Sequence, residues 1–349
     1  MRGIFKQTIL GAIGFFGAAA VMRGVIPWPV EYGLQAKWEY FREHKDEFDA
    51  VFLGTSRVFR GVDTPLIDAE LARRGIRLHS FNFGVAGMRA FEQDFVLHRL
   101  LGLEPAHLEW VFMEGGPWTP RFKHPSLTYS SRSVFWHTPR QTLQALESVH
   151  RMDASLSERL KLAATHLDLM LWRLCSYGQG RTLARKLLLH GADAARLANT
   201  MAIIDEQQGY QSGDQYTGRD LMKGREDLRE DPSDFEAQVA RIEAENEAFP
   251  APETVNRRAV RGQYEAASEH GVELVYVVDP GYEGAPERLL LHREGEIPLL
   301  LNFNRPSLYP ELYDVRNRFD EKHLNQHGAE AFSRILAATL AEEILGKRE

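Results

Sequence analysis

One stretch, residues 50–57 (AVFLGTSR), constrains the fold of this chain more than any other. A short apolar run that passes directly into glycine, threonine and serine is typical of a buried β-strand followed by a tight polar turn. Open α/β sheets bind ligands at the carboxyl ends of their strands, so Ser56 is expected where a substrate can reach it. Ser56 is therefore a candidate nucleophile, although the same residues also suit an ordinary loop and a helix N-cap.

A second polar segment, residues 318–329, lies near the C-terminus and leads into a strongly periodic apolar stretch. It carries Asp320 and His323 three residues apart. A carboxylate at this spacing can hydrogen-bond one imidazole nitrogen while the other nitrogen faces a hydroxyl, which is the base half of a hydrolytic triad. Alone, the pair equally suits a carboxylate at a helix start and a surface histidine. Together with Ser56 in one α/β domain, it predicts a Ser-His-Asp set.

Strand-like and helix-like patterns alternate on both sides of a central region. Apolar runs that end in polar turns predict strands, and apolar residues at intervals of three and four predict helices. The expected strands are residues 49–53, 78–83, 110–113, 272–278 and 297–302, and the expected helices are residues 31–48, 64–72, 90–101, 256–270 and 328–345. This alternation is typical of an α/β fold with a parallel sheet wound with helices.

Two positions at the ends of these elements carry specific expectations. Thr64 is the expected N-cap of the helix at 64–72, with Pro65 at its first helical position. Asp279 follows the strand at 272–278 and is therefore expected on the same edge of the sheet as Ser56. There it either binds substrate or forms the turn.

The central region interrupts the alternation. Residues 141–204 are helical in pattern, with leucines at intervals of three and four around 160–174 and 183–189, and are interpreted as an inserted helical cap or as additional core helices. Residues 205–252 are rich in Asp, Glu, Gln and Gly and are expected to be a poorly packed or mobile segment over the surface. The domain prediction is an anchor at 1–30, a first core part at 31–135, an insertion at 136–254 and a second core part at 255–349.

The first 30 residues have the character of an export signal. Arg2 and Lys6 precede an apolar run over 8–22, and an extension to Trp28 gives about twenty residues, enough to span a bilayer as an uncleaved anchor. The small residues at 18–20 also permit signal-peptide cleavage, and a buried core helix is the third interpretation. The favoured anchor predicts a protein of the cell membrane, with everything after about residue 30 on the periplasmic, extracytoplasmic side.

Composition and missing motifs exclude several classes of function. The formal net charge of −7 argues against a nucleic-acid partner. Cys175 is the single cysteine, so neither an internal disulfide nor a cysteine-based zinc cluster can form. The chain has no dinucleotide-binding glycine motif, no P-loop and no zinc-protease motif. We therefore expect no cofactor and no metal.

Three segments together resemble the SGNH (GDSL-like) hydrolase superfamily: residues 54–56 (GTS), residues 82–87 (NFGVAG) and residues 320–325 (DEKHLN), in that order and spacing. The resemblance covers the chain before about residue 120 and after about residue 255. It implies a flavodoxin-like parallel sheet with helices on both faces. Within the superfamily, the chain is most similar to membrane-anchored envelope proteins that assist O-acylation of cell-surface polymers.

The resemblance implies a role for each matching residue. Ser56 is the expected nucleophile, His323 the general base and Asp320 the group that orients His323. The oxyanion hole is expected to comprise the backbone N–H groups of Ser56 and Gly87.

The third conserved block of the family is altered here. In residues 111–118 (VFMEGGPW), Pro117 occupies the place of the asparagine that completes the oxyanion hole, and proline supplies neither a side-chain donor nor an N–H. One lost donor typically costs about 3 kcal/mol of transition-state stabilisation. Asn82, Glu114 and Trp118 are candidates for lining the pocket, and Glu114 and Trp118 equally suit packing.

The resulting functional expectation is a membrane-anchored serine esterase or O-acyltransferase. Its substrate would be an acyl ester of a cell-envelope glycan or glycolipid, and acetyl is the expected acyl group. The reaction would pass through an acyl-serine. The alternative is a noncatalytic assembly or polymer-binding partner of an integral-membrane acyltransferase. Pro117 favours this alternative, and the presence of Ser56, Asp320 and His323 together opposes it.

Overall fold

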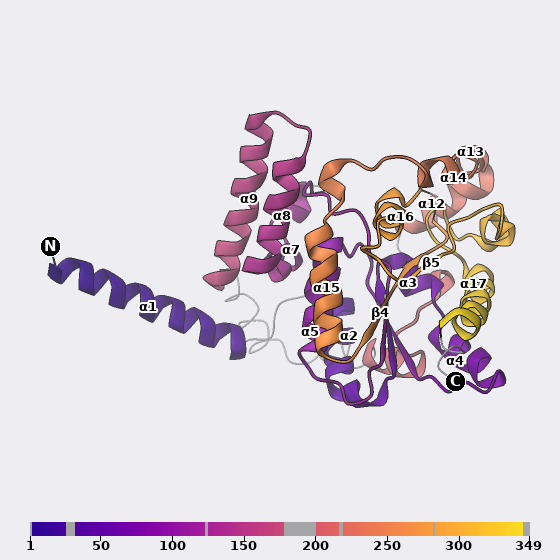
Figure 1. The fold of residues 1–349 in the computed structure, drawn as a ribbon, viewed down its shortest axis with the longest axis horizontal. Helices are drawn as coiled ribbons and strands as arrows, with labels where there is room; N and C mark the ends of the chain where they lie inside the picture. The colour runs from indigo at the N-terminus through magenta and orange to yellow at the C-terminus, as the bar shows by residue number, and fades with distance from the viewer. Residues whose placement is uncertain are drawn as a thin grey trace. The chain divides into compact units, whose positions relative to one another are not determined.

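The computed structural model describes residues 2–25, 32–122, 125–177, 200–215, 219–281 and 283–344 (Figure 1). The chain forms two compact units. Unit 1 comprises Met1–Ala36 and Thr119–Thr200, and unit 2 comprises Lys37–Trp118 and Met201–Glu349. All the candidate site residues lie in unit 2.

Unit 2 is built on a five-stranded sheet with the strand order β2-β1-β3-β4-β5. The strands are β1 (Ala50–Gly54), β2 (Ser80–Gly84), β3 (Trp110–Met113), β4 (Glu273–Val278) and β5 (Leu300–Asn302). Every neighbouring pair is parallel, which confirms the predicted α/β fold with a parallel sheet. The strand order reverses direction beside β1, and in open α/β sheets ligands bind at such a switch point.

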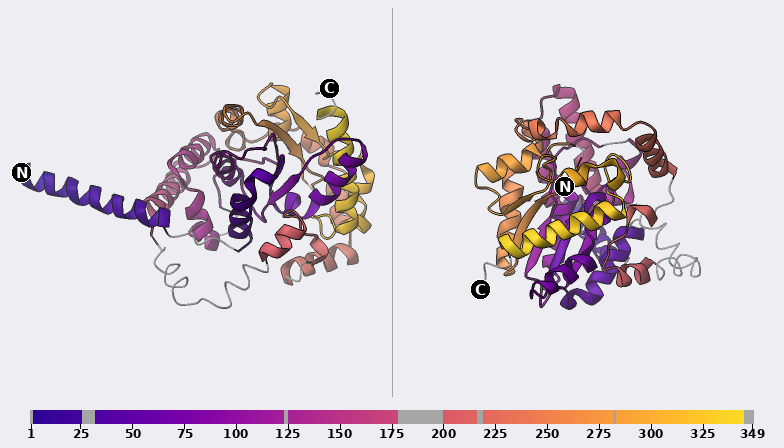
Figure 2. Two further views of the ribbon diagram at one scale, coloured as in Figure 1. Left: turned by 90° about the horizontal axis from the view of Figure 1, so that it is seen from below. Right: turned by 90° about the vertical axis from the view of Figure 1, so that its right-hand side faces the viewer.

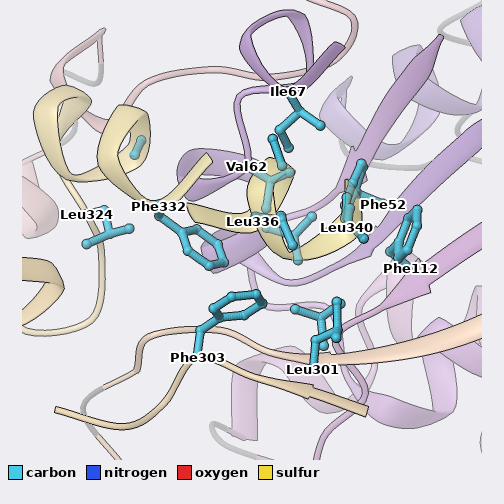
Figure 3. Close-up of a cluster of buried hydrophobic side chains, with 14 of the residues drawn as sticks. Phe52, Val62, Ile67, Phe112, Leu301, Phe303, Leu324, Phe332, Leu336 and Leu340 are labelled. Atoms are coloured by element: carbon cyan, nitrogen blue, oxygen red, sulfur yellow. The ribbon is translucent and has the colours of Figure 1, made fainter. Parts of the chain in front are cut away.

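One face of the sheet is covered by α4 (Thr64–Arg73) and α17 (Gln326–Thr339). Because side chains alternate between the faces of a strand, Phe52 and the paired Phe112 lie on this same face, with ring centroids 4.8 Å apart. Phe332 of α17 meets Phe303 edge to face (Figure 3). This fully buried aromatic layer ties the C-terminal helix to strands from both halves of the chain.

The other face is covered by α2 (Tyr32–His44), α5 (Ala90–Leu101) and α15 (Arg257–Glu269) (Figure 1). Phe81 of β2 stacks on Tyr40 of α2, with centroids 5.7 Å apart. The amide of Gln263 in α15 donates to the carboxylate of Asp94 in α5 at 2.9 Å. Helices therefore flank both faces, and the apolar residues of the strands are buried between them.

Residues 205–252 differ from the poorly packed segment that was expected. Their described part forms α12 (Arg219–Glu230), α13 (Ser233–Val239) and α14 (Ile242–Asn246). Leu228, Phe235 and Ile242 lie in the same core as α17. Large apolar residues are few here, but each of these short helices directs one of them inward, so the low apolar content did not reveal the packing.

Unit 1 is helical in its described part, as the leucine pattern predicted. Its helices are α1 (Arg2–Val25), α6 (Pro125–Thr128), α7 (Ser131–Trp136), α8 (Pro139–Arg151) and α9 (Leu156–Leu174). Thr138 and Ser155 cap α8 and α9 through their side chains. Figure 2 shows α1 extending from the rest of unit 1 as one long helix. The helix expected at 183–189 lies outside the described residues.

The remaining elements of unit 2 are short helices. They are η1 (Lys45–Glu47), α3 (Ser56–Gly61), η2 (Gly213–Gln215), η3 (Pro252–Thr254), α16 (Pro286–Arg293), η4 (Pro310–Tyr313), η5 (Val315–Asn317) and η6 (Leu340–Ile344). The prediction of Thr64 as an N-cap is wrong. Asp63 caps α4, because its carboxylate accepts a hydrogen bond from the N–H of Leu66 at 3.1 Å, and Thr64 is the first helical residue.

Gly84, at the end of β2, allows α3 to approach the sheet closely. A Cβ at this position would lie 2.2 Å from the backbone nitrogen of Phe59. Because the backbone cannot give way cheaply, we expect Gly84→Ala to lower the free energy of unfolding by about 3 kcal/mol. Urea unfolding checks this result. The control is Gly33→Ala, where nothing lies within 4 Å and helix propensity predicts no loss; equal stability of the two variants would contradict the prediction.

Candidate active site

Ser56 is the first residue of α3, directly beyond the carboxyl end of β1. Thr55 is the N-cap, and its hydroxyl accepts a hydrogen bond from the N–H of Arg57 at 3.2 Å. Gly54 is required before this turn, since a Cβ there would lie 2.6 Å from a carboxylate oxygen of Glu114. The sharp turn leaves Ser56 partly exposed at the edge of the sheet.

Asp320 and His323 form a local unit in the loop before α17. One carboxylate oxygen of Asp320 accepts hydrogen bonds from the N–H of Lys322 at 2.8 Å and the N–H of His323 at 2.9 Å. The same oxygen lies 2.8 Å from Nδ1 of His323. Both side chains are largely buried. The loop therefore holds the imidazole in one orientation.

The structure brings Ser56 to this unit across 267 residues of sequence, with its Oγ 2.8 Å from Nε2 of His323. A carboxylate can only accept hydrogen bonds, so the contact with Asp320 places the imidazole proton on Nδ1 of His323. Nε2 is then an acceptor for the hydroxyl proton of Ser56. The three residues thus have the connectivity of a nucleophile, a base and an orienting carboxylate.

The electrostatics of Asp320 favour its ionised form. Burial alone would raise the pKa of Asp320, but the hydrogen bond and charge of His323, together with the two backbone N–H groups, outweigh it and lower the pKa. Asp320 is therefore an anion at neutral pH, and it stabilises the imidazolium that forms when His323 accepts a proton.

The predicted oxyanion donors lie on two adjoining turns. The N–H of Ser56 is at the start of α3, where backbone N–H groups are not used inside the helix. Gly87 is exposed and has a φ of 69°, in the left-handed region that glycine tolerates. Val85 donates its N–H to the carbonyl of Gly54 at 2.9 Å, which joins the turn of Gly87 to the end of β1.

Asn82 was expected as a candidate pocket residue, but the structure buries it completely. Its amide nitrogen donates to the carbonyls of Val58 at 2.8 Å and Val62 at 2.7 Å. The buried ammonium of Lys37 donates to the backbone carbonyls of Asn82 and Gly84 at 2.8 and 2.7 Å. Asn82 therefore attaches α3 to β2.

Glu114 is fully buried beneath the turn that carries Ser56 and supports it. Its carboxylate accepts from the N–H of Thr55 at 2.5 Å and from Nε of Arg57 at 2.9 Å. Arg288 donates to the backbone carbonyl of Glu114 at 2.7 Å. Arg57 and Arg288 were not among the predicted site residues. The acidic residue directly after the strand at 110–113 was the sequence signal for a buried ion pair at this edge.

Trp118 is buried and packs edge to face against Phe91 at 5.2 Å. It lines a small cavity with Gly116 and Arg288, but none of the three triad residues lines that cavity. Pro117 is exposed beside it. The altered third block thus supplies packing through Trp118 and a buried carboxylate through Glu114.

Asp279 lies at the end of β4, in the same charged cluster as Glu114 and Arg57. Burial and the negative charge of Glu114 raise the pKa of Asp279 to about 7, and Arg57 and Arg288 oppose that rise. A folded pKa above the usual value of 3.8 means that ionisation of Asp279 costs stability. The stability that protonated Asp279 contributes to the fold is fully present below about pH 4 and is lost as the pH rises through about 7.

We expect Asp279→Asn to gain stability relative to the wild type as the pH rises. Asparagine keeps the shape but has no proton to lose, so its melting temperature should exceed that of the wild type by several degrees more at pH 8 than at pH 4.5. Thermal melts of the full chain at both pH values measure the difference. Glu269→Gln, on the exposed end of α15, is the control. A melting-temperature gap that stays constant with pH would contradict the expectation.

No cluster of three His, Cys, Asp or Glu side chains suited to a metal ion occurs among the residues that the structure describes. In comparisons with known proteins, no protein-family model matches the chain, and no curated protein matches it.

Proposed function

We propose that the protein is a membrane-anchored serine esterase or O-acyltransferase of the SGNH type, acting on acyl esters of cell-envelope glycans. The observation that carries this proposal is the 2.8 Å contact between Ser56 Oγ and His323 Nε2, with Asp320 on the far side of the imidazole. The strand order 2-1-3-4-5, which is the flavodoxin-like order, supports it.

In the proposed reaction, Nε2 of His323 takes the hydroxyl proton of Ser56 while Oγ attacks the ester carbonyl. The N–H groups of Ser56 and Gly87 stabilise the oxyanion. His323 then gives its proton to the departing alcohol oxygen, which leaves an acyl-serine. A water molecule or a sugar hydroxyl attacks the acyl-serine, loses its proton to His323 and releases Ser56. Hydrolysis and transfer differ only in that second nucleophile.

The noncatalytic alternative, a binding partner of an integral-membrane acyltransferase, has one observation in its favour. Pro117 is exposed and cannot donate a hydrogen bond, so the oxyanion would have one donor fewer than the family pattern supplies. One missing donor costs about 3 kcal/mol, or 10²- to 10³-fold in kcat, which slows an esterase without abolishing it. The triad geometry therefore favours the enzyme.

A fluorophosphonate probe tests the proposal, because it reacts covalently only with an activated serine. The full chain in detergent is incubated with the probe and read by intact mass, beside Ser56→Ala and His323→Ala. We expect one adduct on the wild type and none on either variant. A folded wild type that stays unlabelled would favour the binding partner. Acetylated sugars, with water or a glycan as acceptor, then separate hydrolase from transferase.

The membrane location is part of the proposal. Phe5–Met22 of α1 is long and apolar enough to cross a membrane, which alone is weak evidence, since a signal sequence passes the same test. A second feature of unit 1 supports the membrane location, namely an exposed apolar face on α9, a helix whose end contacts α1. The hydroxyl of Ser176, just beyond α9, donates to the carbonyl of Ala19 in α1 at 2.9 Å. Nearby, α9 exposes leucines at helical intervals on one side: Leu156, Leu160, Leu167 and Leu171.

The lone cysteine offers a direct test of orientation. Cys175 is partly exposed at the end of α9, and Tyr177 is 64% exposed. We expect a membrane-impermeant maleimide to label Tyr177→Cys in a Cys175→Ser background on intact spheroplasts, with no need for lysis. Cys175→Ser alone is the unlabelled control. Labelling of the introduced cysteine only after lysis would place this unit in the cytoplasm and contradict the proposed location.

A further inference from the structure

A small cavity adjoins the triad in unit 2. Its walls are Arg57, Asp279, Pro280, Lys322, Leu324 and Phe332. Arg57 is the chain neighbour of Ser56, and Lys322 and Leu324 are the two chain neighbours of His323. The cavity is therefore lined by residues next in sequence to Ser56 and His323, and not by these two residues themselves.

Asp279 is the unusual member of this wall. The residue is only 4% exposed, and apart from its own backbone N–H neither carboxylate oxygen has a hydrogen-bond partner among the described residues. A buried carboxylate without a donor is costly, and native proteins normally satisfy such groups. The carboxylate of Asp279 can therefore accept a further hydrogen bond from a bound molecule.

The local backbone explains why the protein does not supply that donor itself. A carboxylate at a strand end is often satisfied by the N–H groups of the next two residues. Here the next residue is Pro280, which has no N–H, and the N–H of Gly281 donates to the side chain of Asn304 at 3.1 Å.

The two arginines whose charges act on Asp279 donate hydrogen bonds to Glu114. Arg57 directs Nε and Nη2 to the carboxylate of Glu114. Arg288 directs Nη1 to the backbone carbonyl of the same residue. The charges of these arginines lower the pKa of Asp279, but neither arginine donates a hydrogen bond to it.

We propose that Asp279 is a substrate-binding residue that accepts a hydrogen bond from a sugar hydroxyl adjacent to the acyl-bearing position. A neutral donor suits the site best, since the carboxylate repels an anion, whereas Arg57 and Lys322 in the same wall repel a cation. The inference rests on the proposed function and deepens it. It names a polyhydroxylated alcohol as the acyl-bearing or acyl-accepting part and assigns its recognition to Asp279.

Two matched substrates test the role of Asp279. One is a monoacetylated methyl glucoside, and the other is the same ester with every free hydroxyl methylated. At pH 8, where Asp279 is ionised, we expect the full-length wild type to prefer the hydroxylated ester through KM, and Asp279→Asn to lose at least tenfold of that preference. A hydrogen bond to a charged group contributes about 1.5–3 kcal/mol, which corresponds to roughly 10- to 150-fold. Glu269→Gln, on the exposed end of α15, should keep the wild-type preference.

Each other result overturns a defined claim. If Asp279→Asn keeps the preference for the hydroxylated ester, or if kcat/KM for both esters falls equally, Asp279 has no role in recognising a hydroxyl. If the wild type neither reacts with the fluorophosphonate probe nor cleaves either ester, the proposed catalysis fails. Calorimetric binding of unacetylated methyl glucoside to Ser56→Ala and to Ser56→Ala/Asp279→Asn then decides the inference separately, since a binding partner that uses Asp279 would lose affinity in the second variant.

Discussion

Ser56→Ala is expected to lower kcat on acetyl esters by about four to six orders of magnitude, because it removes the atom that forms the acyl intermediate. His323→Ala should have an effect of similar size, since Nε2 of His323 is the only base in hydrogen-bond contact with Ser56 Oγ in the described structure. The effects of substituting residues that act as one unit are not additive, so the Ser56→Ala/His323→Ala variant should be no slower than either single variant. Turnover of 4-nitrophenyl acetate measures all three.

Ser233→Ala is a matched control for the loss of a serine hydroxyl. Ser233 is also the first residue of a short helix, but it is exposed on α13. We expect its kcat to equal that of the wild type. More than a tenth of wild-type activity in Ser56→Ala would show that the nucleophile has been misassigned, whatever the geometry of the triad.

Glu114→Gln is expected to lower both the stability and the activity of the protein. Removing one partner of a buried ion pair typically costs about 3–5 kcal/mol, and the lower end applies here because the side chain of Arg57 is 24% exposed. The substitution preserves shape but leaves Arg57 and Arg288 without the carboxylate charge. A loss of about 3 kcal/mol corresponds to roughly 6–12 °C in melting temperature for a domain of this size. Thermal melts measure it.

The activity of Glu114→Gln should fall by about 10- to 100-fold in kcat, because Glu114 also holds the N–H of Thr55 and so the turn that presents Ser56. Glu294→Gln removes an exposed ion pair with Arg257 and should cost less than about 1 kcal/mol. A Glu114→Gln protein that melts within 2 °C of the wild type would refute the supporting role of Glu114.

Local patterns carried much of the fold prediction. Each strand of the sheet was expected from an apolar run that ends in a polar turn, and four of the five expected ranges overlap the observed strands almost completely. The fifth, expected at 297–302, is shorter, because β5 lies at the edge of the sheet and pairs only over Leu300–Asn302. The spacing of Asp320 and His323 was also sufficient, since their contact is made within a single loop.

Contacts between distant segments could not be derived in this way. Asn82 and Glu114 were both candidates for lining the pocket, and the structure buries both completely. The packing of residues 205–252 was predicted from their composition. Composition does not show that three large apolar side chains each face inward from a different helix. The role of a polar residue depends on which other segments satisfy it, and those segments lie far away in the chain.

The sequence by itself determined the parallel α/β class, the serine at the end of the first strand and the Asp-His pair, because strand periodicity, turn chemistry and short spacings are local properties. Only the tertiary structure decided that Ser56 and His323 meet at 2.8 Å, that Glu114 supports the turn that carries Ser56 and that no other described residue donates to the carboxylate of Asp279. These three facts depend on how the strands pack side by side. That packing follows from burial of side chains contributed by the whole chain.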